Sequence, residues 1–136
     1  MKKIQIIGPY RGKSDAEKEQ NIFRAWEESL HWWALGFFVL TPQCNSRNMS
    51  GVCSEAQFLR GYLDTIPLMN AVVVLPGYGT SEGSIKEVQY ARTLQVFCLY
   101  KDIDKSYNIY NPIEERLEVI ALEAAVEHIR SSGRYA

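Results

Sequence analysis

The stretch AVVVLPGYGTSEGSIKE, residues 71–87, decides the fold. Its first five residues are continuously apolar, and a strand that is apolar on both faces is typical of a parallel sheet covered by helices on each side. A glycine-rich turn follows over residues 76–83, and a helix is expected over about residues 84–94. A strand, a turn and a helix therefore follow one another directly.

The same alternation continues in both directions along the chain. Apolar strands are predicted at residues 3–7, 37–40 and 96–100, and helices at about residues 14–35, 54–70 and 111–130. Such a pattern favours a three-layer α/β fold, with a flavodoxin-like or Rossmann-like parallel sheet and helices on both faces. Residues 43–52, rich in Asn and Ser, are expected to form a functional loop.

Side-chain signals mark the ends and faces of these helices. Ser14 and Glu17 fit a capping box, while Asn111 followed by a proline fits the start of the last helix. In the first helix the apolar face is expected to comprise Ile22, Trp26, Leu30, Trp33 and Ala34. Aromatic residues gathered on one helix usually lie in the core or at a subunit interface.

Composition narrows the class of protein. The 136 residues predict one domain, residues 1–136, and a net charge of −1 argues against polymeric nucleic acid as a partner. Cys44, Cys53 and Cys98 show no CxxC spacing, so we expect neither disulfides nor zinc, in a reduced, cytoplasmic setting. The longest apolar run, residues 32–40, is far below the roughly 18 residues that would span a membrane.

Ligands of such folds bind beyond the carboxyl ends of the strands, where the strand order reverses. After the first strand stands GPYRG, residues 8–12, in which Arg11 offers planar donors suited to a phosphate or carboxylate. The alternative is a solvated loop arginine. In the turn after the third strand, free backbone amides at the helix start predict an anion site, although glycines there can also serve steric needs alone.

Glu87 also has two interpretations. Ser84 and Glu87 fit a capping box, in which a carboxylate near a helix N-terminus is stabilising. The alternative is a carboxylate nucleophile that attacks an anomeric carbon. The spacing of Ser84 and Glu87 alone favours the role of Glu87 in a helix cap.

Taken together, GPYRG, Thr41-Pro42, the Asn-rich loop, AVVVLPG and the pattern S-x-G-x-x-x-E at residues 81–87 resemble the nucleoside 2-deoxyribosyltransferase-like superfamily. The likeness covers roughly residues 3–100 and is nearest to its small, often phage-encoded, uncharacterised members. It implies that Glu87 is the nucleophile that cleaves an N-glycosidic bond. It also implies that Ser81 and Arg11 hold the phosphate of a nucleoside 5′-monophosphate, since relatives that act on unphosphorylated nucleosides have Asp in place of Ser81.

The resemblance implies a complete site. Catalysis would use Glu87 and Tyr62, with no metal and no organic cofactor, and the partners would be a small nucleotide and further copies of the chain. The expected binding residues are Gly8, Pro9, Tyr10, Arg11, Asn45, Asn48, Gly77, Ser81, Gly83 and Ser84.

The chain also departs from the superfamily. Gln5 stands where Tyr is common, and Tyr62 and Asn70 stand where two Asp residues are usual, so that Tyr62 or Glu82 would have to supply the proton. The alternative function is a nucleotide-binding protein without turnover. PGYGT at residues 76–80 is also similar to the turn of lysine-decarboxylase-like phosphoribohydrolases, which implies the same class of reaction.

Overall fold

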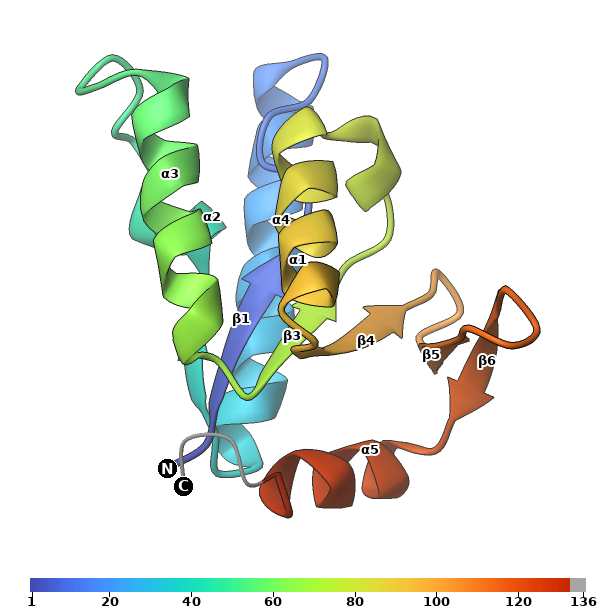
Figure 1. The fold of residues 1–136 in the computed structure, drawn as a ribbon. Helices are drawn as coiled ribbons and strands as arrows, with labels where there is room; N and C mark the ends of the chain where they lie inside the picture. Colours follow the sequence, from blue (N-terminus) through green and yellow to red (C-terminus); the bar gives the residue numbers. More distant parts are fainter. Residues whose placement is uncertain (133–136) are drawn as a thin grey trace.

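The computed structural model describes residues 1–132, which form a six-stranded sheet flanked by helices (Figure 1). The strand order is β2-β1-β3-β4-β5-β6, in which the first four strands are parallel and the last two pair antiparallel. The strands are β1 (Lys3–Ile7), β2 (Phe38–Leu40), β3 (Ala71–Val74), β4 (Phe97–Lys101), β5 (Tyr107–Asn111) and β6 (Arg116–Ile120). The predicted α/β fold is confirmed, but the sheet is mixed rather than wholly parallel.

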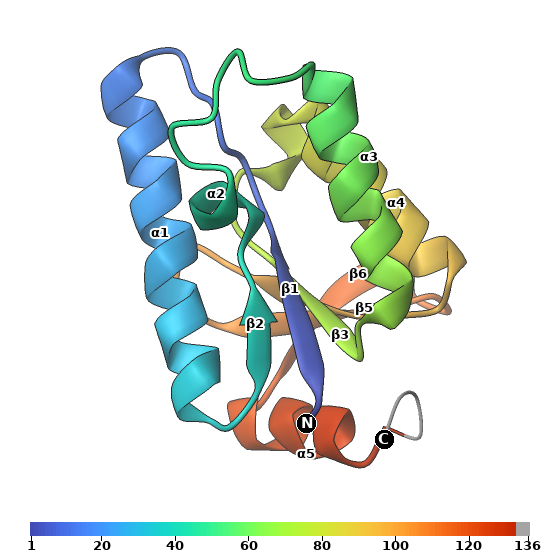
Figure 2. The ribbon, with the colours of Figure 1, turned by 90° about the vertical axis from the view of Figure 1, so that its left-hand side faces the viewer.

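Helices cover both faces of the sheet. Helices α1 and α5 lie against one face, and α3 and α4 lie against the other (Figure 2). The helices are α1 (Asp15–Ala34), α2 (Pro42–Asn45), α3 (Glu55–Thr65), α4 (Glu82–Thr93) and α5 (Leu122–Arg130), with short 3-10 turns η1 (Ile66–Leu68) and η2 (Tyr78–Thr80). No helix in the described residues is long and apolar enough to cross a membrane.

The side chains of β1 alternate between the two cores. Ile4 and Ile6 belong to the core under α1 and α5, whereas Ile7 belongs to the core under α3 and α4. Gln5 is fully buried on the same side as Ile7, because side chains two apart in a strand share a face. A polar side chain therefore occupies a core position of a central strand.

The predicted helix over residues 111–130 is wrong in its first half. Asn111 does cap a turn, since its Oδ1 accepts hydrogen bonds from the N–H groups of Ile113 (2.9 Å) and Glu114 (3.1 Å). Glu115 then takes a φ of 53°, which a right-handed helix cannot contain. The chain therefore turns back to form β6, and only α5 is helical.

Helix α1 begins as predicted, because the Ser14 side chain accepts from the Glu17 N–H. Its predicted apolar face is wrong, because Trp26, Leu30 and Trp33 each expose about half of their surface. Of the predicted face only Ile22 is buried, and α1 buries Ala25, Glu28 and Trp32 in place of the others.

The carboxylate of Glu28 connects α1 to strands β4 and β5. It accepts hydrogen bonds from Trp32 Nε1 (2.9 Å) and the Tyr107 hydroxyl (2.5 Å), and it pairs with the Lys101 ammonium. A buried carboxylate needs such partners, so this network orients the helix and leaves the other aromatic residues outside.

Candidate functional site

The strand order reverses between β1 and β3, as the sequence predicts, and the loops that follow these two strands are neighbours. The Leu75 N–H donates to the Ile7 carbonyl (2.8 Å), and a Cβ on Gly77 would lie 3.6 Å from Pro9 Cγ. Gly77 has a φ of 86°, which favours glycine over residues with a side chain. The two loops and the start of α4 therefore lie together at the carboxyl edge of the sheet (Figure 1). Folds of this kind bind ligands in a crevice at such a point of reversed strand order, and we call this place the crevice.

Ser81 is the N-cap of α4, and its side chain accepts from the Ser84 N–H (3.3 Å). The capping box expected for Ser84 and Glu87 is therefore wrong, because the helix starts two residues earlier than predicted. Ser84 is buried, and Glu87 lies in the second turn of the helix. The backbone amides of Glu82 and Gly83 precede the first intrahelical bond, and amides in this position suit an anion.

Glu87 carries its carboxyl group into the interior of the protein. Its Oε2 is buried, and within residues 1–132 it has no hydrogen-bond partner. Burial raises the pKa of Glu87 from an ordinary value of 4.5 to about 7, while a hydrogen bond from the Gln5 side chain acts in the opposite direction. At neutral pH this carboxyl group therefore exchanges readily between its acid and its ionised form.

Gln5 is itself held in place from α3. Its Oε1 accepts from the Thr65 hydroxyl (2.6 Å), and its Nε2 donates to the Tyr62 carbonyl (3.1 Å). Strand β1 and helices α3 and α4 thus converge on one buried amide and carboxyl pair. This is the most specific chemical arrangement at the crevice.

The side chain of Tyr62 points to α2 at the start of the predicted loop. Its hydroxyl accepts from Asn45 Nδ2 (2.9 Å), contacts the Ser46 hydroxyl and lies 3.4 Å from the Pro42 carbonyl. The predicted loop over residues 43–52 thus begins as a helical turn, and hydrogen bonds from this turn to Tyr62 connect it to α3. Asn48 lies farther along, exposed, with a φ of 63°.

Arg11 lies at the mouth of the crevice, with 63% of its side chain exposed. Its guanidinium pairs with Glu55 in the first turn of α3, while its carbonyl accepts from Asn21 Nδ2 (2.7 Å). The loop after β1, which also holds Gly8, Pro9 and Tyr10, is therefore tied to α1 on one side and to α3 on the other. An anion bound by Arg11 has to compete with the Glu55 carboxylate.

Sequence reasoning missed two glutamines. Gln5 drew attention only as a departure from the superfamily, although a polar residue within the apolar run KIQII was a signal. Gln43 is 3% exposed and donates from Nε2 to the Gly8 carbonyl (3.0 Å), while its buried Oε1 has no partner in the part of the chain that the structure describes. That oxygen can accept a hydrogen bond from a ligand hydroxyl or amine.

The next feature is the set of side chains that could bind a metal ion. Among residues 1–132 no group of three His, Cys, Asp or Glu side chains could hold a metal ion. The groups described at the crevice are carboxyl groups, amides, hydroxyls, helix-terminal N–H groups and the Arg11 guanidinium.

Several solved structures share this fold, and two of them are described here. One is a 2-deoxyribosyltransferase from Bacillus psychrosaccharolyticus, described as a biocatalyst for nucleoside synthesis, with 19% identity over 72% of this chain and 70% of that chain and a TM-score of 0.53. The other is a 2-desoxiribosyltransferase from Leishmania mexicana, with 18% identity over 90% of this chain and 80% of that chain and a TM-score of 0.53. No curated protein matches the chain. The resemblance to the 2-deoxyribosyltransferase-like superfamily is thereby confirmed at the level of the fold.

A family match covers the part of the chain that builds the crevice. It extends over residues 2–100, which include every strand and helix from β1 to α4 and all of the candidate site residues. The hairpin of β5 and β6 and the helix α5 lie outside it. The chain belongs to the family described as Domain of unknown function (DUF4406).

Proposed function

We propose that this protein cleaves or transfers at the N-glycosidic bond of a ribo- or deoxyribonucleoside 5′-monophosphate, with Glu87 as the nucleophile. The observation that carries the proposal is the Glu87 carboxyl group at the crevice between β1 and β3. Its buried Oε2 has no partner among the described residues, and Gln5 lies beside it. The structural neighbours are named for transfer of 2-deoxyribosyl groups, which supports a sugar carbon as the reacting centre.

The proposed reaction has two steps. A Glu87 oxygen bonds to the anomeric carbon while the bond from that carbon to the base nitrogen breaks, and the base leaves with the electron pair and takes up a proton. Water, or a second base, then attacks the same carbon and releases Glu87. Hydrolysis and transfer differ only in this acceptor.

The phosphate would lie at the N-terminus of α4. Ser81 and the amides of Glu82 and Gly83 face an anion there, and Arg11 stands on the adjoining loop. Gln43 Oε1 and the α2 turn, with Asn45, would contact the sugar or base. Release of free base from a panel of nucleoside monophosphates, followed by chromatography, tests the proposal directly.

Replacing Arg11 by Ala is expected to weaken a bound nucleoside 5′-monophosphate by about 1.5 to 3 kcal/mol, because a charge-assisted hydrogen bond to phosphate is lost. The unphosphorylated nucleoside should bind as before. Isothermal titration of both ligands measures the difference, with Lys13→Ala, an exposed cation on the same loop, as control. An equal loss for both ligands would show that Arg11 does not recognise phosphate.

Replacing Glu55 by Gln is expected to tighten the same monophosphate, because Arg11 no longer has a competing carboxylate partner. The pair is exposed, so the gain should be small, about two- to fivefold, in line with an exposed ion pair. The same titration measures it, with Asp64→Gln as a control, since Asp64 pairs with Arg60 on the same helix. Unchanged or weaker phosphate binding in Glu55→Gln would contradict the competition.

The second candidate function is nucleotide binding without turnover. The Tyr62 hydroxyl is occupied by α2, which leaves it poorly placed to deliver a proton to a leaving base. A protein that binds a nucleotide through the same crevice and never releases its base would serve as a sensor or a sequestering protein.

We also propose that the protein works in the cytoplasm as a homo-oligomer. The three cysteines, Cys44, Cys53 and Cys98, are free thiols, which is consistent with a reducing compartment. Support for self-association comes from the exposed aromatic residues of α1.

A further inference from the structure

The outer face of α1 carries a stripe of large apolar side chains, the α1 stripe. Phe23 is 55% exposed, Trp26 46%, Leu30 47% and Trp33 47%. The Phe23 and Trp26 rings lie 5.6 Å apart, and the Trp33 ring lies 5.5 Å from Phe38 on the edge strand β2. An exposed apolar surface of this extent marks an interaction site.

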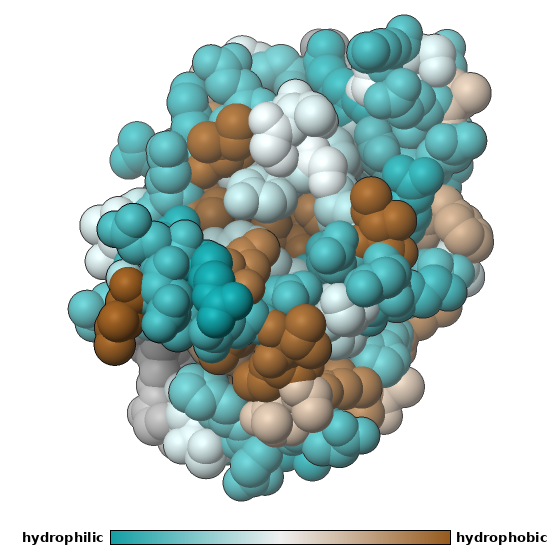
Figure 3. All heavy atoms as spheres, turned by 90° about the vertical axis from the view of Figure 1, so that its right-hand side faces the viewer, coloured by the Kyte–Doolittle hydropathy of each residue, from teal (hydrophilic) through white to brown (hydrophobic). Residues whose placement is uncertain are grey.

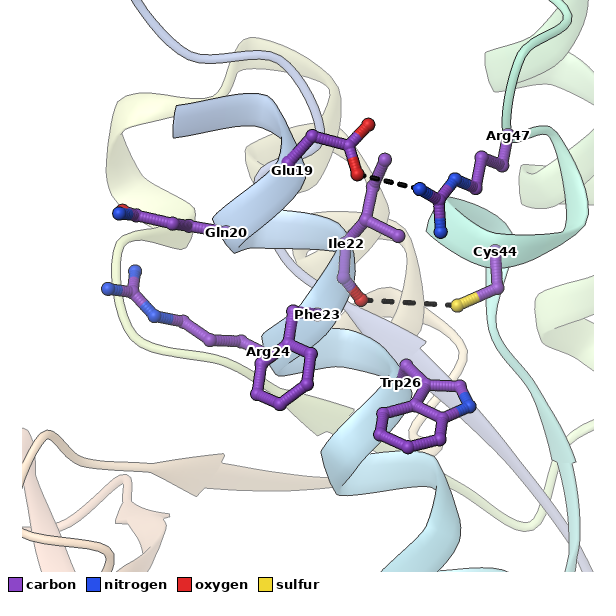
Figure 4. Close-up of a pocket in the computed structure, with 8 residues that line it drawn as sticks. All are labelled: Glu19, Gln20, Ile22, Phe23, Arg24, Trp26, Cys44 and Arg47. Carbon is purple, nitrogen blue, oxygen red and sulfur yellow. Dashed lines mark hydrogen bonds and ion pairs between the residues drawn. The ribbon is translucent and has the colours of Figure 1, made fainter. Parts of the chain in front are cut away.

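A cavity lies beside the first half of this stripe (Figure 4). It measures about 700 Å³ and lies on α1 at the point where α2 approaches, away from the crevice. Phe23, Trp26 and Ile22 supply its apolar wall, and Cys44 closes it from α2, with Sγ 4.0 Å from the Ile22 carbonyl. Arg24 and Arg47 stand at its rim, and Arg47 pairs with Glu19 (2.7 Å).

The spacing of the stripe is self-complementary. Its four members follow one another at intervals of three, four and three residues, which is symmetric about Glu28. When a second α1 lies antiparallel across the first, Trp26 faces the partner's Leu30, and Phe23 faces the partner's Trp33. The same contact occurs twice about a two-fold axis, as an isologous interface requires.

We propose that two copies of this chain dimerise through antiparallel α1 helices, each inserting Leu30 and Trp33 into the cavity beside Phe23 and Trp26 of the other. This inference is independent of the reaction proposed above.

Charge and surroundings favour a second copy as the occupant. The cavity lies by the N-terminal half of α1, so it receives the C-terminal half of the partner helix. Arg24 and Arg47 at the rim of the cavity then lie near the C-terminal end of the partner's α1, which carries the negative end of the helix dipole. The two antiparallel helix dipoles also attract each other. The face of the molecule on the side of β5 and β6 also shows apolar patches, with hydrophilic residues between them (Figure 3).

The first test is the mass of the protein in solution. Light scattering at micromolar concentration should give twice the 15.6 kDa of one chain. Trp33→Glu and Phe23→Glu should each raise the dimer dissociation constant by roughly 100-fold, because a charge would enter the centre of the interface. Both residues are half-exposed, so circular dichroism should show folded protein. Val119→Glu is the control, since Val119 is 74% exposed on β6.

A monomeric wild-type protein would overturn the proposal, and so would a dimer that both α1 variants leave intact.

The second test determines the orientation of the two helices by cross-linking. Gln20 and Glu27 are about two turns apart on one flank of α1, and only Glu27 lies near the two-fold axis. A short bis-maleimide should therefore join two chains of Glu27→Cys and not of Gln20→Cys, with the wild-type cysteines as background. Equal cross-linking at both positions would indicate parallel helices and contradict the proposal.

Discussion

Replacing Glu87 by Gln is expected to abolish base release from a nucleoside 5′-monophosphate, with a loss on the order of 10⁴-fold in kcat. Glutamine has nearly the same shape and still fits beside Gln5, but its amide cannot form the ester with the anomeric carbon. The residues proposed to hold the phosphate are untouched, so binding of the monophosphate should persist. Loss of turnover with retained binding would distinguish a nucleophile from a merely structural carboxylate.

The wild-type rate should also depend on pH in a defined direction. In the proposed mechanism only ionised Glu87 attacks the sugar, and the pKa of Glu87 is raised to about 7, so kcat/KM should increase as the pH rises through about 7. Glu82→Gln, which removes an exposed carboxylate in the first turn of the same helix, tests whether Glu82 supplies the proton. If no nucleotide loses its base while one binds tightly, and Glu87→Gln binds it equally well, the protein is a binder rather than an enzyme.

The strand, turn and helix of residues 71–87 could be predicted because each depends on local signals. A continuous apolar run forms β3, Gly77 adopts a positive φ, and a serine caps α4. Even here the capping serine is Ser81 rather than the predicted Ser84. The two serines stand three residues apart and cap equally well, so the sequence does not distinguish them. The position of Glu87 in the second turn follows from that choice.

The hairpin and the orientation of α1 could not be predicted from local pattern. Asn111 caps a turn with the same hydrogen bonds that begin a helix, and the positive φ of Glu115 decides the outcome. Helix α1 has two candidate faces, and the buried one is selected by Glu28, whose partners Lys101 and Tyr107 lie more than seventy residues away. Contacts at such separation leave no periodic trace in the sequence.

In the candidate site, too, some features could be predicted from the sequence and others depend on contacts between distant residues. Arg11 and Ser81 could be assigned to one edge of the sheet, because a reversal of strand order places the two loops together. The pKa of Glu87 depends instead on burial, which raises it, and on a hydrogen bond from Gln5, which lowers it and which Thr65 and Tyr62 orient from another helix. Both causes come from tertiary packing, which the residues next to Glu87 in the sequence do not reveal.

Glu87→Gln is expected to stabilise the protein at alkaline pH, whether or not the protein is an enzyme. The pKa of Glu87 is raised from 4.5 to about 7 in the folded state, so between these values the folded protein keeps a proton that the unfolded chain releases. The free energy of unfolding of the wild type therefore falls as the pH rises through this window. The total change corresponds to about 3 kcal/mol, complete above pH 7 and absent below pH 4.5.

Glutamine mimics the protonated acid and has no such dependence, so the stability of the variant relative to wild type should grow by that amount between pH 4 and pH 8. Urea unfolding of both proteins at each pH measures this difference, and the titration of other groups cancels because both proteins share them. Glu82→Gln should show no comparable change, since Glu82 is exposed. A constant difference between Glu87→Gln and wild type at the two pH values would mean that the carboxyl group ionises as readily as in water. The buried, unpartnered oxygen on which both the nucleophile and the pH profile depend would then be solvated.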